Sequence, residues 1–449
     1  AAALAGVALL TGAGQPLRAA ERPAGLDQVQ QIVVIYMENR AFDTLYGLFP
    51  GAEGIANAGA TATQTDKDGK PYATLPPVMD TEHKPAIVDP RFPKDLPNKP
   101  FLIDPYVPTN QKTGDLVHRY YQQLQQINGG KMDRFAAESD AGGLVMGYYD
   151  GRPMQLWKYA QKYTLADHFF QAAIGGSFLN HQWLICACTP HNPNAPADLW
   201  AQLDANGRMV KDGAYTPDGY AVNTIMPAYT PYRKTASDPA RRLQPVTLPT
   251  IGDRLSEKGI PWVWYSGGWD DAVAGKPGPL FQYHHQAFAY YERYGDNTPG
   301  RAQHLKDWKD FSAAIDAGKI PAVVFYKPYG DENQHPGYAE VDSGDRHVAD
   351  ILRRIEAGPQ WKSTVVIITY DENGGSWDHV PPPIADRWGP STRVPALIIS
   401  PFAKKGHVDH THYDTTSILA FIELRHGLKP LTDRDAKANP LLGALHFTK

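Results

Sequence analysis

Side chains that could hold a cation follow directly on two apolar runs of this 449-residue chain. The runs, residues 31–36 and 365–370, are rich in β-branched residues and predict strands buried on both faces. The acid and amide residues that follow the two runs are Glu38, Asn39, Asp371 and Glu372. Carboxylates at the end of a buried strand are costly to desolvate unless a cation meets them, and such oxygen-bearing groups suit a hard divalent ion. Two such strands side by side predict a metal site at the edge of a sheet.

Helix capping is the competing explanation for these polar residues. Glu38 and Asn39 could simply cap the helix that follows them, and capping could explain either pair alone. It does not explain why two separate strands both end in an acid and a further polar residue. We therefore expect the two pairs to form one cluster.

A serine that could act as a nucleophile stands at position 177, after two glycines and before a run compatible with a helix. The exposed N–H groups and the dipole at a helix N-terminus favour an anion and lower the pKa of a hydroxyl. An ordinary N-cap serine explains the same local sequence equally well. The Gly-x-Ser-x-Gly pattern is absent, so the nucleophile turn of the α/β-hydrolases is not indicated.

Histidines occur at three further places where they could meet a phosphoryl group. His118 falls in the first turn of a helix predicted over 115–127, and His335 lies in the loop after a strand predicted over 320–327. His284 and His285 form a pair among aromatic residues, where they are either part of the core or two imidazoles offered to a phosphate or a metal. A single histidine is more often structural than functional.

Alternating strands and helices must position these groups. Predicted strands cover 31–36, 262–265, 320–327, 365–370 and 395–401. Predicted helices cover 115–127, 154–163, 248–255 and 347–355, with a terminal helix starting within 410–417. Most strands carry their polar residues at the carboxyl end, where ligands bind in open α/β sheets. The pattern predicts a three-layer α/β/α sandwich with a mostly parallel central sheet.

The composition and the positions of the loop regions predict one large domain. Hydrophobic residues make up 42% of the chain, which excludes global disorder, and the net charge of −4 without basic runs argues against a nucleic-acid partner. We expect a single catalytic domain over 26–449, with a long loop region over 51–110 and a lid-like insertion over 190–249. Cys186 and Cys188 are too close in sequence for an ordinary disulfide, so we expect two small buried apolar residues.

The first 25 residues are expected to be the remnant of an export signal. Residues 1–14 form an uncharged Ala/Leu/Val/Gly run, shorter than the about 20 residues of a membrane span. Ala19 and Ala20 lie near a possible cleavage point. A frayed helix is the alternative. The expectation is an exported protein, periplasmic or secreted, without a stable membrane span.

Several motifs resemble those of a known family. They are 38–43 (ENRAFD), 176–181 (GSFLNH), 371–375 (DENGG) with Asp378 and His379, and 393–395 (RVP). Together they resemble the phosphoesterase family of bacterial phospholipases C and AcpA-type acid phosphatases, over about residues 31–424. Residues 118–121 and 128–133, the His284–His285 pair, and a serine at 177 in place of threonine look closer to the acid-phosphatase branch.

The resemblance implies an alkaline phosphatase-like fold and a specific set of ligands and reacting groups. One divalent ion, which could be calcium, magnesium, manganese or zinc, would be held by Glu38, Asn39, Ser177, Asp371 and Glu372. Ser177 would attack phosphorus and form a phosphoseryl intermediate. Asn39 would also meet the substrate, and protonated imidazoles would surround the phosphoryl group, contributed by His118, His284, His285 and His335. Asp378 and His379 would either support the site or be structural.

The implied activity is the hydrolysis of small phosphate monoesters at acidic pH with broad specificity. The enzyme alternative is a phospholipase C that cleaves phosphocholine-type diesters, for which tyrosines and tryptophans could form a choline pocket. The non-enzyme alternative is a degenerate fold that binds phosphorylated ligands without turnover, and the complete acid, amide and serine set argues against it. The sequence does not indicate an oligomeric state.

Overall fold

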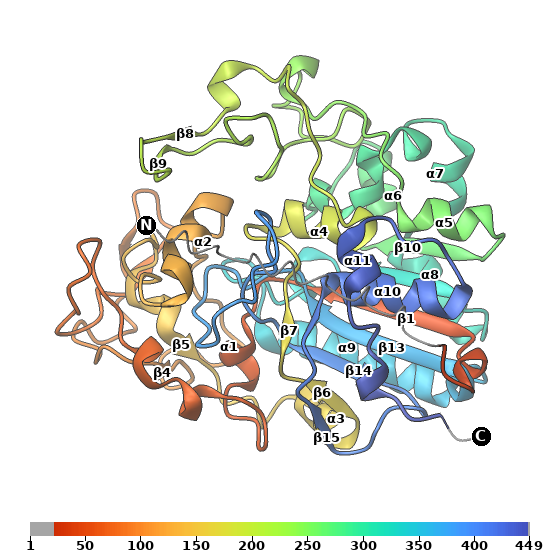
Figure 1. Ribbon diagram of the computed structural model, residues 1–449, viewed down its shortest axis with the longest axis horizontal. Helices are drawn as coiled ribbons and strands as arrows, with labels where there is room; N and C mark the ends of the chain where they lie inside the picture. The colour runs from red at the N-terminus through yellow and green to blue at the C-terminus, as the bar shows by residue number, and fades with distance from the viewer. Residues whose placement is uncertain (1–21, 448–449) are drawn as a thin grey trace, which may run out of the picture.

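The computed structural model describes residues 22–447, which fold around one large central sheet (Figure 1). The strand order in this eight-stranded sheet is β11-β10-β12-β1-β13-β14-β6-β15. Their bounds are β1 (Gln31–Met37), β6 (Thr164–Ala166), β10 (Trp262–Ser266), β11 (Leu305–Asp307), β12 (Val323–Lys327), β13 (Thr364–Tyr370), β14 (Ala396–Ile399) and β15 (His407–Asp409). All five predicted strands are therefore present, and the remaining three are short strands at the two edges.

The two strands that precede the predicted metal ligands are direct neighbours. β1 pairs in parallel with β13 from Gln31 opposite Thr364 to Met37 opposite Tyr370. Every residue of β13 is buried, as its β-branched sequence predicts. Because parallel strands in register end at the same edge, the polar residues after β1 and β13 are adjacent. β14 runs antiparallel to both of its neighbours, so the sheet is mostly parallel.

Helices cover both faces of the sheet, which confirms the predicted three-layer sandwich. At the end of β1, Tyr36 donates its hydroxyl to the carbonyl of Asn180 in α4, whereas the next side chain, Met37, lies against Gly344 of α9. Consecutive residues of a strand point to opposite faces, so α4 and α9 belong to different layers. Helices α4, α5 and α10 form one contacting group and α3, α8 and α9 the other. Their bounds are α3 (Gln155–Lys162), α4 (Ser177–Cys186), α5 (Ile251–Glu257), α8 (Trp308–Asp316), α9 (Val341–Ala357) and α10 (Thr415–His426).

The predicted helix over 115–127 is shorter than expected, so the placement of His118 in its first turn is wrong. Helix α2 (Tyr120–Ile127) begins after His118. The backbone N–H of Val117 donates to Asp140, and that of Tyr120 donates to Asn223. These contacts with distant segments hold the chain before Tyr120 extended, and a local helical pattern carries no information about them.

Two long irregular stretches lie outside the sandwich. Residues 51–110 contain short strands and single turns, as predicted, and residues 190–249 contain the small hairpin of β8 and β9 and sit above the sandwich in Figure 1. The further short elements are α1 (Phe42–Tyr46), α6 (Trp269–Val273), α7 (Pro299–His304), α11 (Asp433–Lys437), β2 (Met79–Asp80), β3 (Ile87–Val88), β4 (Phe101–Leu102), β5 (Gly147–Tyr148), β7 (Phe169–Phe170), β8 (Gln202–Leu203), β9 (Met209–Lys211) and β16 (Tyr413–Asp414).

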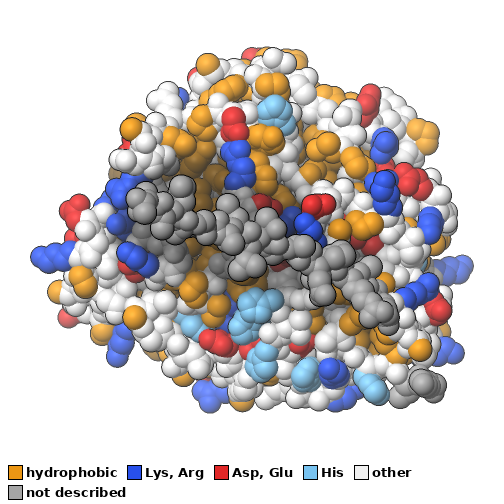
Figure 2. All heavy atoms as spheres, in the orientation of Figure 1, with side chains coloured by type: hydrophobic (Ala, Val, Ile, Leu, Met, Phe, Trp, Pro, Cys, Tyr) orange, Lys and Arg blue, Asp and Glu red, His pale blue; other side chains and the backbone are white. Residues whose placement is uncertain are grey.

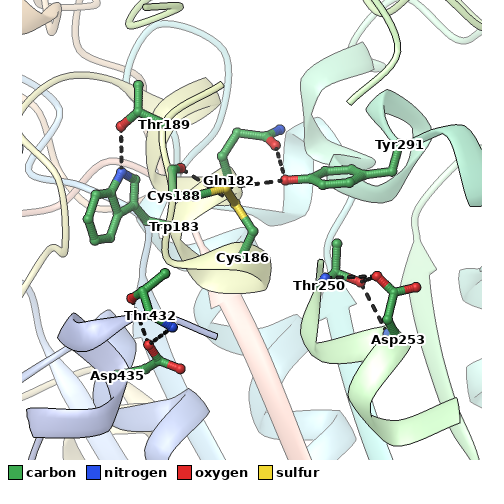
Figure 3. The surroundings of a disulfide bond; sticks show 10 residues. All are labelled: Gln182, Trp183, Cys186, Cys188, Thr189, Thr250, Asp253, Tyr291, Thr432 and Asp435. Carbon is green, nitrogen blue, oxygen red and sulfur yellow. Dashed lines mark hydrogen bonds between the residues drawn. A yellow bond between two sulfur atoms is a disulfide. The ribbon is translucent and has the colours of Figure 1, made fainter. Parts of the chain in front are cut away.

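The two cysteines form a disulfide, which corrects the expectation that they are reduced apolar residues (Figure 3). Helix α4 ends at Cys186, and the next residue, Ala187, adopts a left-handed conformation with φ of 49°. This residue reverses the chain, so the Cα atoms of Cys186 and Cys188 lie 5.1 Å apart, within the usual range for a disulfide. Sequence separation alone excluded the bond because it assumed an ordinary backbone between the cysteines.

A buried arginine forms hydrogen bonds with the loops that follow three strands. Arg393 is fully buried, and its guanidinium donates to Asp378 over 2.8 Å and to Asp43 over 3.2 Å. It also donates to the backbone carbonyls of Glu53 and Asp167. Asp43 follows β1, Asp378 follows β13, and Asp167 follows β6. Without the guanidinium, the two buried carboxylates would lose their shared cationic partner, and Asp43 would keep only its contact with His379.

We expect Arg393→Met to lower the free energy of unfolding by about 3–5 kcal/mol, because it leaves buried charges without their partner. The matched control is Arg387→Met, since the Arg387–Asp218 pair is half exposed and worth at most about 1 kcal/mol. Urea unfolding of the two variants beside the wild type measures both values. Equal losses in the two variants would contradict a stabilising role for the buried network.

Candidate active site

The residues after β1 and β13 are locked together by backbone geometry. The N–H of Asp371 donates to the carbonyl of Met37, and the N–H of Asn39 donates to Asp371 Oδ1 over 3.1 Å. Asn39 has a φ of 57°, a left-handed conformation that asparagine tolerates better than most residues. The turn that it makes ends the strand and keeps Glu38 and Asn39 at the same sheet edge as Asp371 and Glu372.

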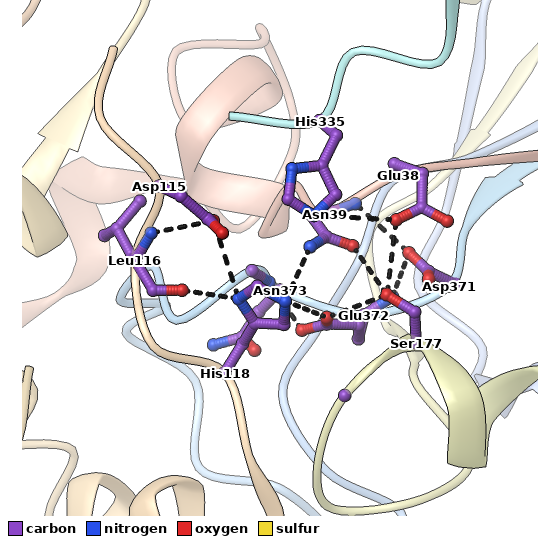
Figure 4. A network of polar contacts seen from close by, with 12 residues as sticks. Glu38, Asn39, Asp115, Leu116, His118, Ser177, His335, Asp371, Glu372 and Asn373 are labelled. Carbon is purple, nitrogen blue, oxygen red and sulfur yellow. Dashed lines mark hydrogen bonds and ion pairs between the residues drawn. The ribbon is translucent and has the colours of Figure 1, made fainter. Parts of the chain in front are cut away.

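Oxygen atoms of three residues, from two segments of the chain, converge on Ser177 (Figure 4). Its Oγ lies 3.2 Å from Glu38 Oε2, 3.2 Å from Asn39 Oδ1 and 3.3 Å from Glu372 Oε1. One hydroxyl proton can serve only one of these three acceptors at a time. The remaining oxygens face each other without a donor between them, which is the arrangement that a bound cation satisfies.

The negative charge of the cluster also indicates a site for a cation. Glu38, Asp371 and Glu372 are all fully buried. Burial and the nearby charge of Glu38 raise the pKa of Asp371 well above its usual range, and burial raises the pKa of Glu372 to about 7. Among the described residues, Asp371 Oδ2 has no hydrogen-bond partner although it is buried. The five expected ligands are thus brought together, and their all-oxygen donor set fits a divalent ion.

Lys327, which the sequence analysis missed, neutralises part of this charge. It is the last residue of β12, is fully buried, and its Nζ contacts Glu38 Oε1. Burial opposes ionisation of Glu38, but His285 and Lys327 hold the pKa of that carboxyl well below its usual range. A lysine ending a predicted strand was the available signal, because the other polar groups of the site also follow strands.

The four predicted histidines divide between two positions. His118, His284 and His335 line a cavity that also exposes Ser177, with a volume of about 450 Å³. His285 lies behind the cluster, and its Nε2 is 2.9 Å from Glu38 Oε1. The first three can therefore reach a ligand in the cavity, whereas His285 acts on a carboxylate.

Only one of these imidazoles favours its cationic form. Burial lowers the pKa of His118, but the carboxylates of Glu372 and Asp115 more than offset this and raise that pKa to about 9. Burial lowers the pKa of His284 well below 6.5, that of His285 to about 4, and that of His335 as well. The expectation of four protonated imidazoles therefore agrees with the structure at His118 alone.

His181 is a second residue that the sequence analysis did not assign. It lies one helical turn after Ser177 on α4, is fully buried, and its Nδ1 is 2.7 Å from the carbonyl of Ser177. The same nitrogen lies 3.8 Å from Asp371 Oδ2, and the ring stacks on His285 at 5.1 Å. Its spacing of four residues from Ser177 was the available signal, since such residues share one helix face.

The expected supporting residues Asp378 and His379 belong to the buried arginine network. Asp378 accepts from Arg393, and His379 Nδ1 lies 2.6 Å from Asp43 Oδ2. Neither residue lines the cavity. Their position connects the loop after β13 to the loop after β1.

Three comparisons place these features among known proteins. A family model described as the phosphoesterase family matches residues 29–429. The chain is 23% identical to the non-hemolytic phospholipase C of Pseudomonas aeruginosa over 91% of its own length and 55% of that protein, and 24% identical to phospholipase C B of Mycobacterium tuberculosis over 95% and 79%. The chain thus spans about half the length of the Pseudomonas relative. A solved structure from Vibrio parahaemolyticus, described as a protein in the alkaline phosphatase superfamily, aligns with a TM-score of 0.36 at 10% identity, over 66% of this chain and 65% of that one.

We expect Asp371→Asn to stabilise the chelator-treated protein at pH 8 and to lower its capacity for a divalent ion. The folded-state pKa of Asp371 is raised, so the wild type loses stability as the pH rises above the unfolded value of about 3.9. An asparagine removes that loss, and the difference between the proteins should shrink toward pH 4.

Thermal unfolding at both pH values and the metal content of dialysed protein measure these effects. The control is Asp331→Asn, which removes one charge from an exposed loop near the same sheet edge. A variant with full metal content and no gain at pH 8 would place Asp371 outside the ligand set.

Proposed function

The chain belongs to the phosphoesterase family, and from that premise we propose that it hydrolyses phosphate monoesters with Ser177 as the nucleophile and a divalent ion as cofactor. The observation that carries this proposal is the position of the Ser177 hydroxyl. It lies at the first residue of α4, opens to the cavity, and sits among the oxygens of Glu38, Asn39 and Glu372. An anion in the cavity would meet both the hydroxyl and the N-terminus of the helix.

The residues of the chain divide the chemistry between them. The contact of Ser177 Oγ with Glu38 and Glu372 gives the hydroxyl proton an acceptor as the oxygen attacks phosphorus. A divalent ion held by Glu38, Asn39, Ser177, Asp371 and Glu372 would lower the pKa of that hydroxyl and withdraw charge from the phosphoryl oxygens. Cationic His118 would stabilise those oxygens from the cavity wall.

Bond formation between Ser177 Oγ and phosphorus would break the bond to the leaving alkoxide. A proton for this alkoxide must come from a group in the cavity, which His335 and His284 line. Because burial lowers the pKa of both histidines, either one would carry that proton only at acidic pH. Water would then hydrolyse the phosphoserine ester and release phosphate. His285, which lies against Glu38, would set the charge of that carboxylate instead of meeting the substrate.

The lining of the cavity supports a monoester substrate. Lys84, Arg119 and Arg233 line it, and these cations suit the dianion of a phosphate monoester. Among residues 22–447, Tyr338 is the one phenol or indole ring in the lining, whereas recognition of a quaternary ammonium uses several aromatic faces.

A phospholipase C acting on phosphocholine-type diesters is the second candidate. The relatives from Pseudomonas aeruginosa and Mycobacterium tuberculosis carry that name. Three carboxylates, Glu82, Asp115 and Asp140, also line the cavity and could meet a choline cation. The two candidates share the nucleophile and the ion, and they differ in what the outer part of the cavity binds.

We further propose that the protein is exported, to the periplasm or to the medium. The disulfide between Cys186 and Cys188 supports this, because disulfides persist in oxidising compartments. No helix within residues 22–447 is long and apolar enough to cross a membrane. Most of the expected export signal, residues 1–21, lies outside the described residues.

We expect Ser177→Ala to lower kcat for p-nitrophenyl phosphate by at least about a thousandfold, as loss of a nucleophile does in other hydrolases. Ser177→Thr is the matched control, because it keeps a hydroxyl at the same position and should retain part of the activity. Steady-state kinetics with each protein saturated with the same metal provides the comparison. An alanine variant that keeps most of its turnover would remove Ser177 from the mechanism.

We expect kcat/KM for the monoester p-nitrophenyl phosphate to exceed that for the diester p-nitrophenylphosphorylcholine by at least about tenfold. When the pH is varied from 4 to 9, we expect the highest rate on the acidic side. A chelator should abolish both activities. Release of p-nitrophenol measures both reactions in parallel. A preference for the choline ester would reverse the order of the two candidates.

A further inference from the structure

A second group of histidines and carboxylates lies where the chain after β6 meets the chain after β15. Parallel pairing sets Ala166 opposite Asp409 and Phe169 opposite Tyr413. The backbone therefore brings residues 167–168 next to residues 410–412, independently of what their side chains do. Figure 2 shows histidine side chains gathered on this face, near the place where Figure 1 shows β7.

One buried carboxylate organises this group. Asp167 is fully buried, and its Oδ1 lies 2.9 Å from His168 Nδ1 and 3.0 Å from His410 Nδ1. Its Oδ2 lies 2.8 Å from the same His410 nitrogen and accepts from the backbone N–H of Glu53 over 2.7 Å. The carboxylate thus fixes the orientation of two imidazoles from segments far apart in the sequence.

We propose that Asp167, His168 and His410 bind a divalent transition-metal ion such as zinc. Each residue offers one ligand atom, and these atoms lie within 4.8 Å of one another. A tetrahedral ion with bonds of about 2.0–2.2 Å separates its ligand atoms by about 3.4 Å, so small shifts of the two rings would admit it. Two imidazoles and one carboxylate suit zinc, copper or nickel, whereas the all-oxygen cluster at Ser177 suits harder ions.

The surroundings supply what such a site needs. His410 keeps 60% of its side-chain surface exposed, so an ion can reach the cluster from solvent. The His412 ring lies 5.0 Å from the His168 ring, and Glu53 Oε2 lies 3.9 Å from His168 Nε2. Glu53 faces the ring nitrogen of His168 that points away from Asp167, so His412 or water is left to complete the coordination.

His379, on the other side of Glu53, is a further buried histidine with a ring nitrogen unpartnered within residues 22–447, and that nitrogen faces Glu53. His379 is only 4% exposed, and its Nε2 has no hydrogen-bond partner among the described residues. That nitrogen lies 3.9 Å from Glu53 Oε1, while Asp43 holds the opposite ring nitrogen over 2.6 Å. Glu53 thus lies between this imidazole and that of His168, with a carboxylate oxygen 3.9 Å from a ring nitrogen of each.

The bound ion would brace the loops behind the active site. Arg393 donates to the backbone carbonyls of Asp167 and Glu53 with the same guanidinium that binds Asp43 and Asp378. Binding at Asp167 would therefore restrain the loops that follow β1 and β13. This is a structural role, and the proposal does not depend on which phosphate ester the enzyme hydrolyses.

Cobalt(II) titration of the metal-stripped full chain tests the proposal, because cobalt replaces zinc and reports nitrogen ligation by visible absorption. The Asp371→Asn background separates this site from the cluster at Ser177. In that background we expect one equivalent of cobalt to bind with visible absorption, and His410→Ala to raise its dissociation constant at least tenfold. His83→Ala is the matched control, since His83 is also 60% exposed and lies 2.9 Å from Asp80.

Each outcome of this experiment decides the question. Loss of affinity in the His410→Ala protein, with wild-type affinity in the His83→Ala protein, supports the site. Equal cobalt affinity and equal spectra in all three proteins overturn it. Thermal unfolding in chelator confirms that each variant folds, which is expected because His410 is exposed. Failure of the proposed phosphatase activity would leave the cobalt result unaffected.

Discussion

Three carboxylates buried at the ends of two adjacent strands are the constraint around which this molecule is organised. Glu38, Asp371 and Glu372 have no access to solvent, and the parallel register of β1 with β13 fixes their separation. Taking such groups out of water is costly unless opposite charge is supplied. Lys327 supplies one positive charge from the next strand, β12. The negative charge that Lys327 does not neutralise remains next to Ser177. Burial and this charge together raise the pKa of Asp371 and Glu372.

Nearby negative charge and burial give the histidines of the cavity different protonation states. His118 keeps its proton because carboxylate oxygens of Glu372 and Asp115 lie 3.6 Å and 3.7 Å from its ring nitrogens. His284 and His335 lose theirs to burial, although they line the same cavity. The site therefore presents one cationic and two neutral imidazoles to a ligand. A division of this kind suits a reaction in which one group stabilises negative charge and another handles a proton.

The sequence was sufficient to predict the central features because they are local. Short apolar runs identified five strands, and the polar pairs Glu38–Asn39 and Asp371–Glu372 identified the cluster. The three strands that the sequence did not indicate have three residues each, too few to show a periodicity. Lys327 and His181 were missed because each lies inside a segment that the sequence pattern assigned to a strand or a helix, and the pattern gave neither residue a functional role. The extended backbone at His118 and the disulfide after α4 depend on tertiary contacts or on one unusual φ angle, which composition does not encode.

The insertion of residues 190–249 leaves the sandwich just after the disulfide at the end of α4 and returns just before α5, and α4 and α5 contact each other. Its two ends are thus anchored side by side on the rigid scaffold. It contributes Asn223, Thr224 and Arg233 to the cavity, whereas Ser177 and the oxygen cluster around it come from the sandwich. The wall of the cavity is therefore shared, because residues 81–140 also line it with Lys84, Arg119 and Asp140. Substitutions within residues 190–249 could change part of this wall without touching the buried oxygen cluster.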